Sequence, residues 1–466
     1  MTSRIQSLRH WGPTVLALAS VLTAASVQAQ PNHAPALHKG SPDAHIAAAL
    51  KNISSARIRA DITTLVGFGT RSTISAQDPA AIAAGRGVGA AREWIKSQFM
   101  QFSTDCGGCL DVRTDGYTQP PAERVPEPTL ITDVYAVLKG TDPSASQRIV
   151  LVTGHYDSRN TDVLDIQHDA PGANDDASGV AVSLECARVL SKLRFPATII
   201  FLTVAGEEQG LYGSGYFAQM AREQNWNIEA ALNNDIVGGD RSGGQKSAVV
   251  RVFSESLPKS VDEAQQQRLR ASGGEEDSAS RQLARYVAET AAVYDTDVEP
   301  LLIFRLDRYL RGGDHISFND QGYAAVRFTE YRENFDHQHQ TVRTEKGIEY
   351  GDLPKWVDYD YVAGVARVNA ATLASLASAP APPTDVAMLT SNLDNDSTLQ
   401  WSAVPGAAGY EVLWRDTTSP EWEHAQDTRG ATGVTLPISK DNVIFAVRAF
   451  DRQGHRSLAV VPQPQR

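Results

Sequence analysis

Two adjacent glutamates, Glu207 and Glu208, follow an apolar segment and lie between Gly206 and Gly210. Neighbouring carboxylates repel one another unless water or cations stabilise them. In such a pair, one carboxylate can bind a metal ion while the other carries a proton to and from an activated water molecule. The pair therefore indicates metal-assisted hydrolysis.

Imidazole and carboxylate groups occur in a fixed order around this pair. His155-Tyr-Asp157 and Asn174-Asp-Asp-Ala-Ser-Gly179 lie upstream, and Asp235 and His339 lie downstream. Each group alone has an ordinary interpretation: a surface triplet, a turn before a helix N-terminus, or a capping residue. Together they supply the nitrogen and oxygen ligands that a two-metal hydrolase needs.

Buried strands are expected to position these groups. Residues 132–138, 148–153 and 197–204 are rich in branched side chains, and the last two segments are almost continuously apolar. That pattern is typical of strands covered on both faces, and a helix between them suits a parallel crossover. His155 and Glu207 follow two of these strands, at the edge where open α/β sheets bind ligands. Residues 46–65 and 87–102 show helical spacing, so we expect two helices to open an α/β fold with a mixed, largely parallel sheet between helices.

A second domain is predicted after a Pro-rich linker at residues 379–384. Short alternating strands at 398–401, 409–415 and 442–450 indicate an all-β sandwich over residues 385–466. The spacing of its Trp and Tyr residues resembles that of a fibronectin type III domain. We expect this domain to act as a spacer or to contact a surface or polymer.

The first 29 residues have the pattern of a secretory signal peptide. Arg4 and Arg9 precede an apolar segment, and Val27-Gln-Ala29 provides small residues for cleavage. Residues 30–43 are expected to form a mobile leader. No later segment reaches the roughly 20 apolar residues of a membrane helix, so we expect an exported protein in the periplasm or the extracellular medium.

The charge balance argues against nucleic acid as a partner. Removal of Arg4 and Arg9 takes the formal net charge from −12 to −14, whereas phosphate backbones require a basic face. Bound divalent cations would neutralise part of this acidity.

The three cysteines fit an exported protein. Cys106 and Cys109 are separated by two glycines, and export favours a small structural disulfide over a redox motif. Cys186 lies in an apolar helical segment and is expected to be buried.

The order of the five motifs resembles that of the co-catalytic two-zinc aminopeptidases, the family of bacterial leucyl aminopeptidase and aminopeptidase Y. The resemblance covers roughly residues 45–377, within a predicted metallopeptidase domain at 44–378. It implies a zinc exopeptidase-like fold and two Zn²⁺ ions per chain, with Mn²⁺ or Co²⁺ as possible substitutes. It also implies a cis peptide between Asp175 and Asp176. The roles that it implies are Asp175 as the bridging ligand, His155 and Asp235 on one metal, Glu208 and His339 on the other, and Glu207 as general base. Asp157 would assist by orienting His155.

Two parts of the pattern leave alternatives open. The family has one late histidine, but this chain has His337 and His339, and the spacing to the next helix favours His339. Asp314 and His315 lie in a segment similar to one that lines the family's substrate pocket, so we expect them in the substrate cleft. A loop hydrogen-bonded to itself is the alternative for this segment.

These features predict a secreted metallo-aminopeptidase that cleaves the first peptide bond of peptides with a free N-terminus. A glutaminyl cyclase or a carboxypeptidase on the same fold is the nearest enzymatic alternative. A receptor-like binding protein without catalytic activity is the alternative from a different class. The full set of ligand types and the candidate base favour the peptidase.

Overall fold

The structure, a computed structural model, describes residues 36–37, 40–391 and 393–466. The predicted signal peptide, residues 1–29, and most of the predicted leader lie outside the described residues. No helix in the described part of the chain is both long enough and apolar enough to cross a membrane.

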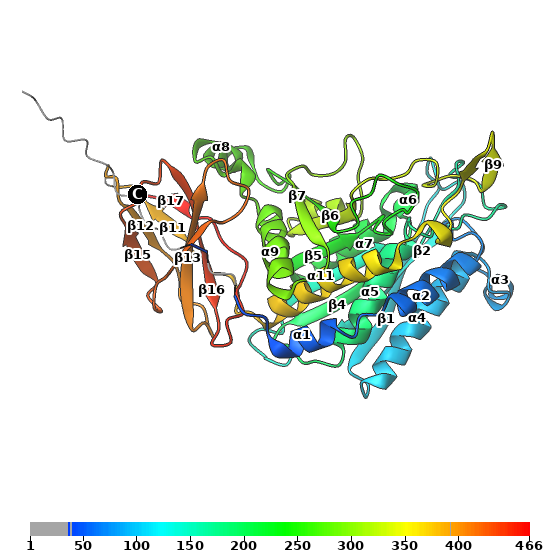
Figure 1. Cartoon of the computed structure of the whole chain (residues 1–466), viewed down its shortest axis with the longest axis horizontal. Coiled ribbons are helices and arrows are strands. Elements are labelled where there is room, and N and C mark those ends of the chain that lie inside the picture. Colours follow the sequence, from blue (N-terminus) through cyan, green and yellow to red (C-terminus); the bar gives the residue numbers. More distant parts are fainter. Residues whose placement is uncertain (1–35, 38–39, 392) are drawn as a thin grey trace, which may run out of the picture. The chain divides into compact units, whose positions relative to one another are not determined.

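Helices and strands alternate through most of residues 44–378 (Figure 1). The helices are α1 (Ala44–Leu50), α2 (Ser55–Gly67), α3 (Pro79–Ala83), α4 (Gly87–Asp105), α5 (Ala177–Leu190), α6 (Glu207–Gly210), α7 (Tyr212–Glu223), α8 (Glu263–Ala271), η1 (Gly274–Glu276), α9 (Ala279–Tyr294), α10 (His315–Asp320), η2 (Pro354–Trp356) and α11 (Tyr359–Ser378). The strands of this part are β1 (Leu110–Gln119), β2 (Thr129–Leu138), β3 (Arg148–His155), β4 (Thr198–Val204), β5 (Asn227–Asn234), β6 (Val249–Ser254), β7 (Glu299–Ile303), β8 (Ala325–Glu330), β9 (Arg343–Glu345) and β10 (Ile348–Tyr350).

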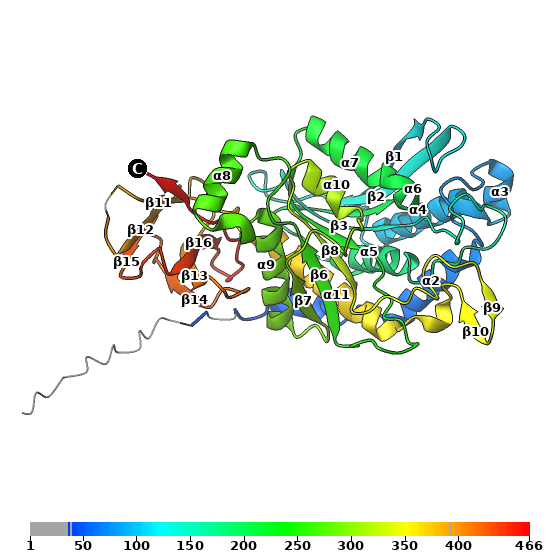
Figure 2. The ribbon, with the colours of Figure 1, turned by 90° about the horizontal axis from the view of Figure 1, so that it is seen from above.

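Eight of these strands form one mixed sheet in the order β1-β2-β4-β3-β5-β8-β6-β7. Its centre is parallel, because β3 pairs in parallel with both β4 and β5, and β5 pairs in parallel with β8. Antiparallel pairs join β1 to β2, β2 to β4 and β6 to β8. Figure 2 shows helices on both sides of this sheet. The predicted mixed α/β fold is confirmed.

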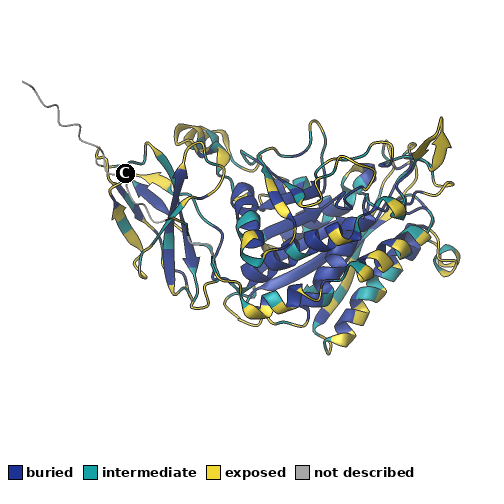
Figure 3. Cartoon of the chain, viewed as in Figure 1, coloured by how far each residue is buried: buried dark blue, intermediate teal, exposed yellow. Residues whose placement is uncertain are grey.

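Both faces of the central strands are buried, which explains their continuous apolar sequence. On β3, Val150 and Val152 join the larger core under α5 and α11, whereas Leu151 joins a second core with Phe217 of α7 and Phe318 of α10. Every residue of β3 and β4 is buried (Figure 3). Such strands form a rigid support for whatever their carboxyl ends carry.

The predicted helix over residues 46–65 is two helices. α1 ends at Leu50, and α2 begins after Ser54, whose side chain accepts a hydrogen bond from the Arg57 amide. Apolar side chains continue across the break, so periodicity did not reveal it. The Ser54 cap was the available signal, because a serine hydroxyl satisfies a free amide at a helix start.

The C-terminal region contains two further sheets, as predicted for a β-rich second domain. They have the orders β15-β12-β11-β17 and β14-β13-β16. The strands are β11 (Ala387–Leu389), β12 (Ser397–Gln400), β13 (Gly409–Asp416), β14 (His424–Asp427), β15 (Gly433–Leu436), β16 (Val443–Phe450) and β17 (Gln463–Gln465). β12, β13 and β16 correspond to the three strands predicted from alternation. The other strands of this region, β11, β14, β15 and β17, were not predicted.

Buried ion pairs join this C-terminal region to α9. Both oxygens of Asp277 lie within 2.9 Å of Arg415 Nη2, and Asp277 Oδ1 also lies 3.0 Å from Arg285 Nη1. Nearby, Arg448 of β16 pairs with Glu289 of α9 at 2.7 Å. β13 is therefore buried on both faces, with Arg415 facing α9 rather than solvent.

Part of the predicted mobile leader also contacts the C-terminal region. Ala36 forms a β-bridge with His424, and the Leu37 amide donates to the Glu423 carbonyl at 2.8 Å. Leu37 packs against the cluster that contains Leu413. These two described residues thus behave as an added strand segment, which differs from the sequence prediction.

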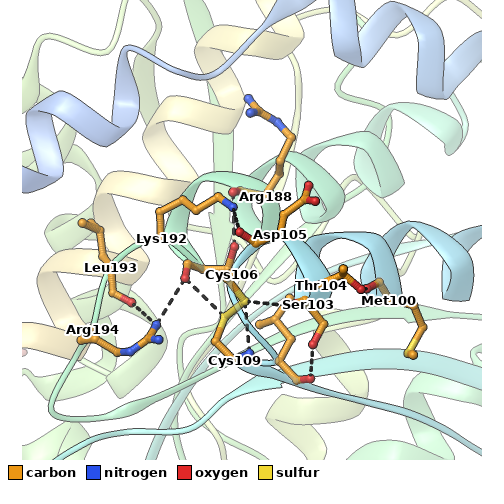
Figure 4. The surroundings of a disulfide bond; sticks show 12 residues. Met100, Ser103, Thr104, Asp105, Cys106, Cys109, Arg188, Lys192, Leu193 and Arg194 are labelled. Atoms are coloured by element: carbon orange, nitrogen blue, oxygen red, sulfur yellow. Dashed lines mark hydrogen bonds between the residues drawn. A yellow bond between two sulfur atoms is a disulfide. The ribbon is translucent and has the colours of Figure 1, made fainter.

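The predicted disulfide between Cys106 and Cys109 is present at the end of α4 (Figure 4). Ser103 Oγ donates to the Leu110 carbonyl at 2.8 Å, and Lys192 Nζ donates to the Asp105 carbonyl at 2.8 Å. These contacts fix the turn between α4 and β1. Cys186 is buried on α5, as expected.

Asp277→Asn tests the junction between α9 and the C-terminal region. The Asp277 side chain is 1 % exposed and those of Arg285 and Arg415 are each 3 % exposed. Loss of one partner from a buried ion pair typically costs about 3–5 kcal/mol, because the remaining charge stays desolvated. We expect a decrease of that order in the free energy of unfolding, measured by urea denaturation.

Asp111→Asn is the matched control for this measurement, because Asp111 pairs with Arg113 on an exposed surface. Exposed pairs contribute roughly 0–1 kcal/mol. Equal effects of the two substitutions would show that the Asp277 pairs do not stabilise the junction.

Candidate metal centre

Asp175 lies between two imidazoles and turns one carboxylate oxygen to each. Its Oδ1 is 3.1 Å from His155 Nε2, and its Oδ2 is 2.9 Å from His339 Nε2. Asp175 is buried, with 5 % of its surface exposed. A carboxylate in this position can bridge two cations.

The other candidate ligands fall into two groups around this carboxylate. His155, Glu207 and Asp235 offer atoms within 4.8 Å of one another, and so do Asp175, Glu208 and His339. Asp235 Oδ1 lies 3.9 Å from His155 Nε2, and Glu208 Oε1 lies 3.1 Å from His339 Nε2. All five predicted metal ligands and the predicted base are therefore in one place.

The carboxyl ends of the parallel strands bring these residues together. His155 is the last residue of β3, Glu207 and Glu208 begin α6 just after β4, and Asp235 follows β5. Asp175 precedes α5, and its peptide bond to Asp176 is cis, as the family resemblance implied. His339 lies on the loop after β8.

The turn at Glu207 depends on glycine. Gly206 has φ +78°, a left-handed conformation that a side chain disfavours, and it starts α6 directly at the end of β4. Because α6 begins so soon after the end of β4, both glutamates stay near the sheet edge. Glu208 is buried, whereas Glu207 is half-buried.

Asp157 connects the histidine to the glutamate turn. His155 Nδ1 lies 3.2 Å from the Asp157 carbonyl oxygen and 3.4 Å from its Oδ1. Asp157 Oδ2 accepts hydrogen bonds from Thr73 Oγ1 at 2.8 Å and from the Glu208 amide at 3.2 Å. The contacts on Nδ1 leave His155 Nε2 directed at Asp175.

Negative charge is crowded at this site. Burial would lower the pKa of His155, but the neighbouring carboxylates of Asp157, Asp175 and Asp235 raise it well above its usual value. Burial, followed by the neighbouring Asp235 and Glu208, raises the pKa of Glu207. Such a cluster needs positive charge, supplied either by protons on the imidazoles or by cations between the groups.

The donor set fits zinc. Two imidazole nitrogens and several carboxylate oxygens converge without a thiolate, a combination that zinc accepts. His155 Nε2 and Glu208 Oε1 are buried, and neither makes a hydrogen bond of acceptable geometry within the described residues. Buried polar atoms of this kind commonly have an ion as partner.

His337, the alternative to His339, lies on the other side of the same loop. Its Nδ1 contacts Asp240 Oδ2, and its ring stacks on Trp356 with centroids 4.3 Å apart. The structure therefore brings His339, and not His337, to Asp175 and Glu208.

Asp314 and His315 are both fully buried. Burial raises the pKa of Asp314 to about 7, and its charge interacts with those of His155 and Asp235. His315 Nε2 lies 2.8 Å from the Leu306 carbonyl, at the start of α10. Neither side chain has exposed surface in this structure, so a role in the substrate cleft stays a prediction.

Several supporting residues were not identified from the sequence. Asp352 accepts the Asp175 amide at 2.7 Å, Arg327 Nη1 lies 2.9 Å from Asp235 Oδ2, and Gln338 Nε2 donates to Asp175 Oδ2 at 3.0 Å. Each lies far in sequence from its partner, and Asp352 and Arg327 also lie outside any motif, whereas Gln338 lies between the two candidate histidines. The apolar neighbours of Arg327 on β8 were the one available signal, because a charge on a buried strand requires a partner.

Comparison with known proteins identifies the family of this chain. A model of peptidase family M28 matches residues 133–358. A probable zinc metalloprotease of Pyricularia oryzae is 48% identical over 435 residues, which cover 91% of this chain and 85% of that protein. Another, from Leptosphaeria maculans, is 46% identical over 433 residues, which cover 92% of this chain and 99% of that protein.

Solved structures show the same fold. The LapA aminopeptidase of Legionella pneumophila matches with a TM-score of 0.50 and 22% identity, over 72% of this chain and 74% of that chain. LapB of the same organism matches with a TM-score of 0.50 and 19% identity. On the strength of the two relatives that share nearly half of its residues across nine-tenths of its length, the chain belongs to peptidase family M28 and is a zinc metallopeptidase.

Proposed function

We propose that this protein is an aminopeptidase that uses two zinc ions. His155 and Asp235 would hold one ion, Glu208 and His339 would hold the other, and Asp175 would bridge them. The single observation that carries the proposal is the position of Asp175, whose two oxygens face two different imidazoles at 3.1 and 2.9 Å. A single metal ion would be bound by only one of these two oxygen–imidazole pairs.

Glu207 is the proposed general base. It is the one half-buried carboxylate in its group, and the burial and neighbouring carboxylates that raise its pKa make it a better proton acceptor. Bound zinc would supply acidity to the attacking water and polarise the scissile carbonyl. Glu207 would take the proton from the water and deliver it to the departing amine, while Asp157 keeps His155 in the orientation that binding requires.

The charge of the site favours recognition of the substrate's amino terminus over recognition of its carboxyl terminus. Glu207 lies at the site, is half-buried and is outside the proposed ligand set. As the ionised base it would attract a substrate ammonium group and repel a carboxylate. This preference supports an aminopeptidase rather than a carboxypeptidase.

Three further assignments belong to this proposal. The protein would be exported by the signal at residues 1–29 and act in the periplasm or the extracellular medium. Residues 44–378 would form the peptidase domain, followed by the linker at 379–384. Residues 385–466 would form a fibronectin type III-like domain that contacts a surface or polymer.

Glu207→Gln and Asp175→Ala separate catalysis from metal binding. Glu207→Gln should keep the fold and bound zinc but lower kcat by about 10²–10⁴-fold, because it removes proton transfer alone. Asp175→Ala should lower both kcat and zinc content, since it removes the bridging ligand. Steady-state kinetics and elemental analysis of the purified variants measure both effects. A Glu207→Gln variant with near-normal kcat would mean that another group is the base.

Substrates with free and blocked N-termini test the reaction class. A panel of aminoacyl chromogenic substrates should be hydrolysed by the full-length protein, and activity should disappear with a chelator and return with zinc. N-acetylated versions of the same substrates should react at least about 10²-fold more slowly, because they lack the ammonium group. Cleavage of blocked peptides from their carboxyl end would favour a carboxypeptidase, and release of pyroglutamyl products without hydrolysis would favour a glutaminyl cyclase.

A further inference from the structure

We propose that the two metal positions are held by separate outer anchors, Arg327 for Asp235 and the His337–Asp240 pair for His339. Each anchor sets the zinc affinity of its own position and leaves the other position unchanged. This inference rests on the proposed two-metal function and adds positioning residues to it.

Arg327 fixes which oxygen of Asp235 is free. Its guanidinium is fully buried on β8, and Nη1 lies 2.9 Å from Asp235 Oδ2. The other oxygen, Oδ1, is the one that faces His155 at 3.9 Å. With one oxygen engaged by a guanidinium, Asp235 can offer a single oxygen to a metal, in one direction.

The Arg327 guanidinium is itself held on more than one side. Nη1 donates to the Gly312 carbonyl at 2.9 Å and lies 3.4 Å from Asp307 Oδ2. A Cβ at Gly313 would lie 2.4 Å from this nitrogen, so only glycine leaves room for the contact. The loop before α10 is thus shaped around the Arg327–Asp235 pair.

His339 needs a different kind of support. Its side chain is 28 % exposed and its backbone has φ +58°, so it lies on a turn rather than in a buried strand. Two residues earlier, His337 is buried, contacts Asp240 Oδ2 through Nδ1 and stacks on Trp356. His337 therefore attaches the His339 turn to the protein interior.

Asp240 is well placed to serve as the fixed end of this attachment. Its amide donates to Glu330 Oε2 at 2.9 Å, and its Oδ1 accepts the Ser242 amide at 2.7 Å. The next amide, of Arg241, donates to the Trp356 carbonyl at 2.7 Å. The segment that carries Asp240 is consequently bound to the same residue on which His337 stacks.

The two anchors use different partners. Among the described contacts, those of Arg327 are with Asp235, Asp307 and Gly312, and those of His337 are with Asp240 and Trp356, apart from backbone hydrogen bonds. Residues that share no partner usually respond independently to substitution, so coupling between the two metal positions would pass only through the shared ligand Asp175. The two metal positions should therefore be separable by mutation.

Chelator-buffered zinc titration of the full-length protein, with Zn²⁺ as the only ligand, tests this separation. Wild type should bind two ions. The variants are Arg327→Met and His337→Phe, and the second keeps an aromatic ring on Trp356. Each variant should bind one ion with wild-type affinity and the other about 10–100-fold more weakly, because loss of a group that supports a metal ligand usually weakens metal binding by that factor. Each variant is the matched control for the other. Crystals grown at limiting zinc should show which position is lost by anomalous scattering.

The outcomes separate the two proposals. Arg327→Lys, which keeps the charge, should recover part of the lost affinity and remains informative if the Met variant fails to fold. If both variants weaken both ions equally, or if neither changes an affinity, the separate anchors are wrong while the two-metal function stands. If wild type itself binds only one ion, the proposed function fails and this inference fails with it.

Discussion

The crowding of carboxylates around Asp175 is the constraint on which the site depends. Asp175 faces two imidazoles, and Asp235, Glu207 and Glu208 lie beside it in a largely buried space. In the folded chain this charge requires compensating positive charge, and the donor set is one that zinc accepts. Buried polar groups surround the candidate ligands and hold them in place, as Asp352 and Gln338 hold Asp175 and as Arg327 holds Asp235.

The fold supplies that support from its most rigid parts. Asp176 caps α5 by accepting the Gly179 amide at 2.9 Å, and its other oxygen accepts the His155 amide at 3.1 Å. The residue next to Asp175, the proposed bridging ligand, therefore joins the start of α5 to the end of β3. Because β3, β4 and β5 run parallel at the centre of the sheet, their ends deliver ligands to one edge without long loops.

Much of this arrangement could be predicted from the sequence. The apolar strands before His155 and Glu207 predicted the sheet and its ligand-binding edge, and the spacing to the next helix favoured His339 over His337. Long-range partners could not be predicted, because Arg327, Asp352 and Asp240 belong to no motif and reach their partners only through the fold. The break at Ser54 and the ion pairs of Asp277 were missed for a similar physical reason. Periodicity reports which face is buried but not where a cap or a buried charge pair interrupts it.

The most direct measurement of the central claim is the number and position of zinc ions in the purified full-length protein. Elemental analysis should give two zinc ions per chain, and anomalous diffraction should place them roughly 3.5–4 Å apart, on either side of the Asp175 carboxylate. A single ion, or two ions that do not share Asp175, would contradict the account.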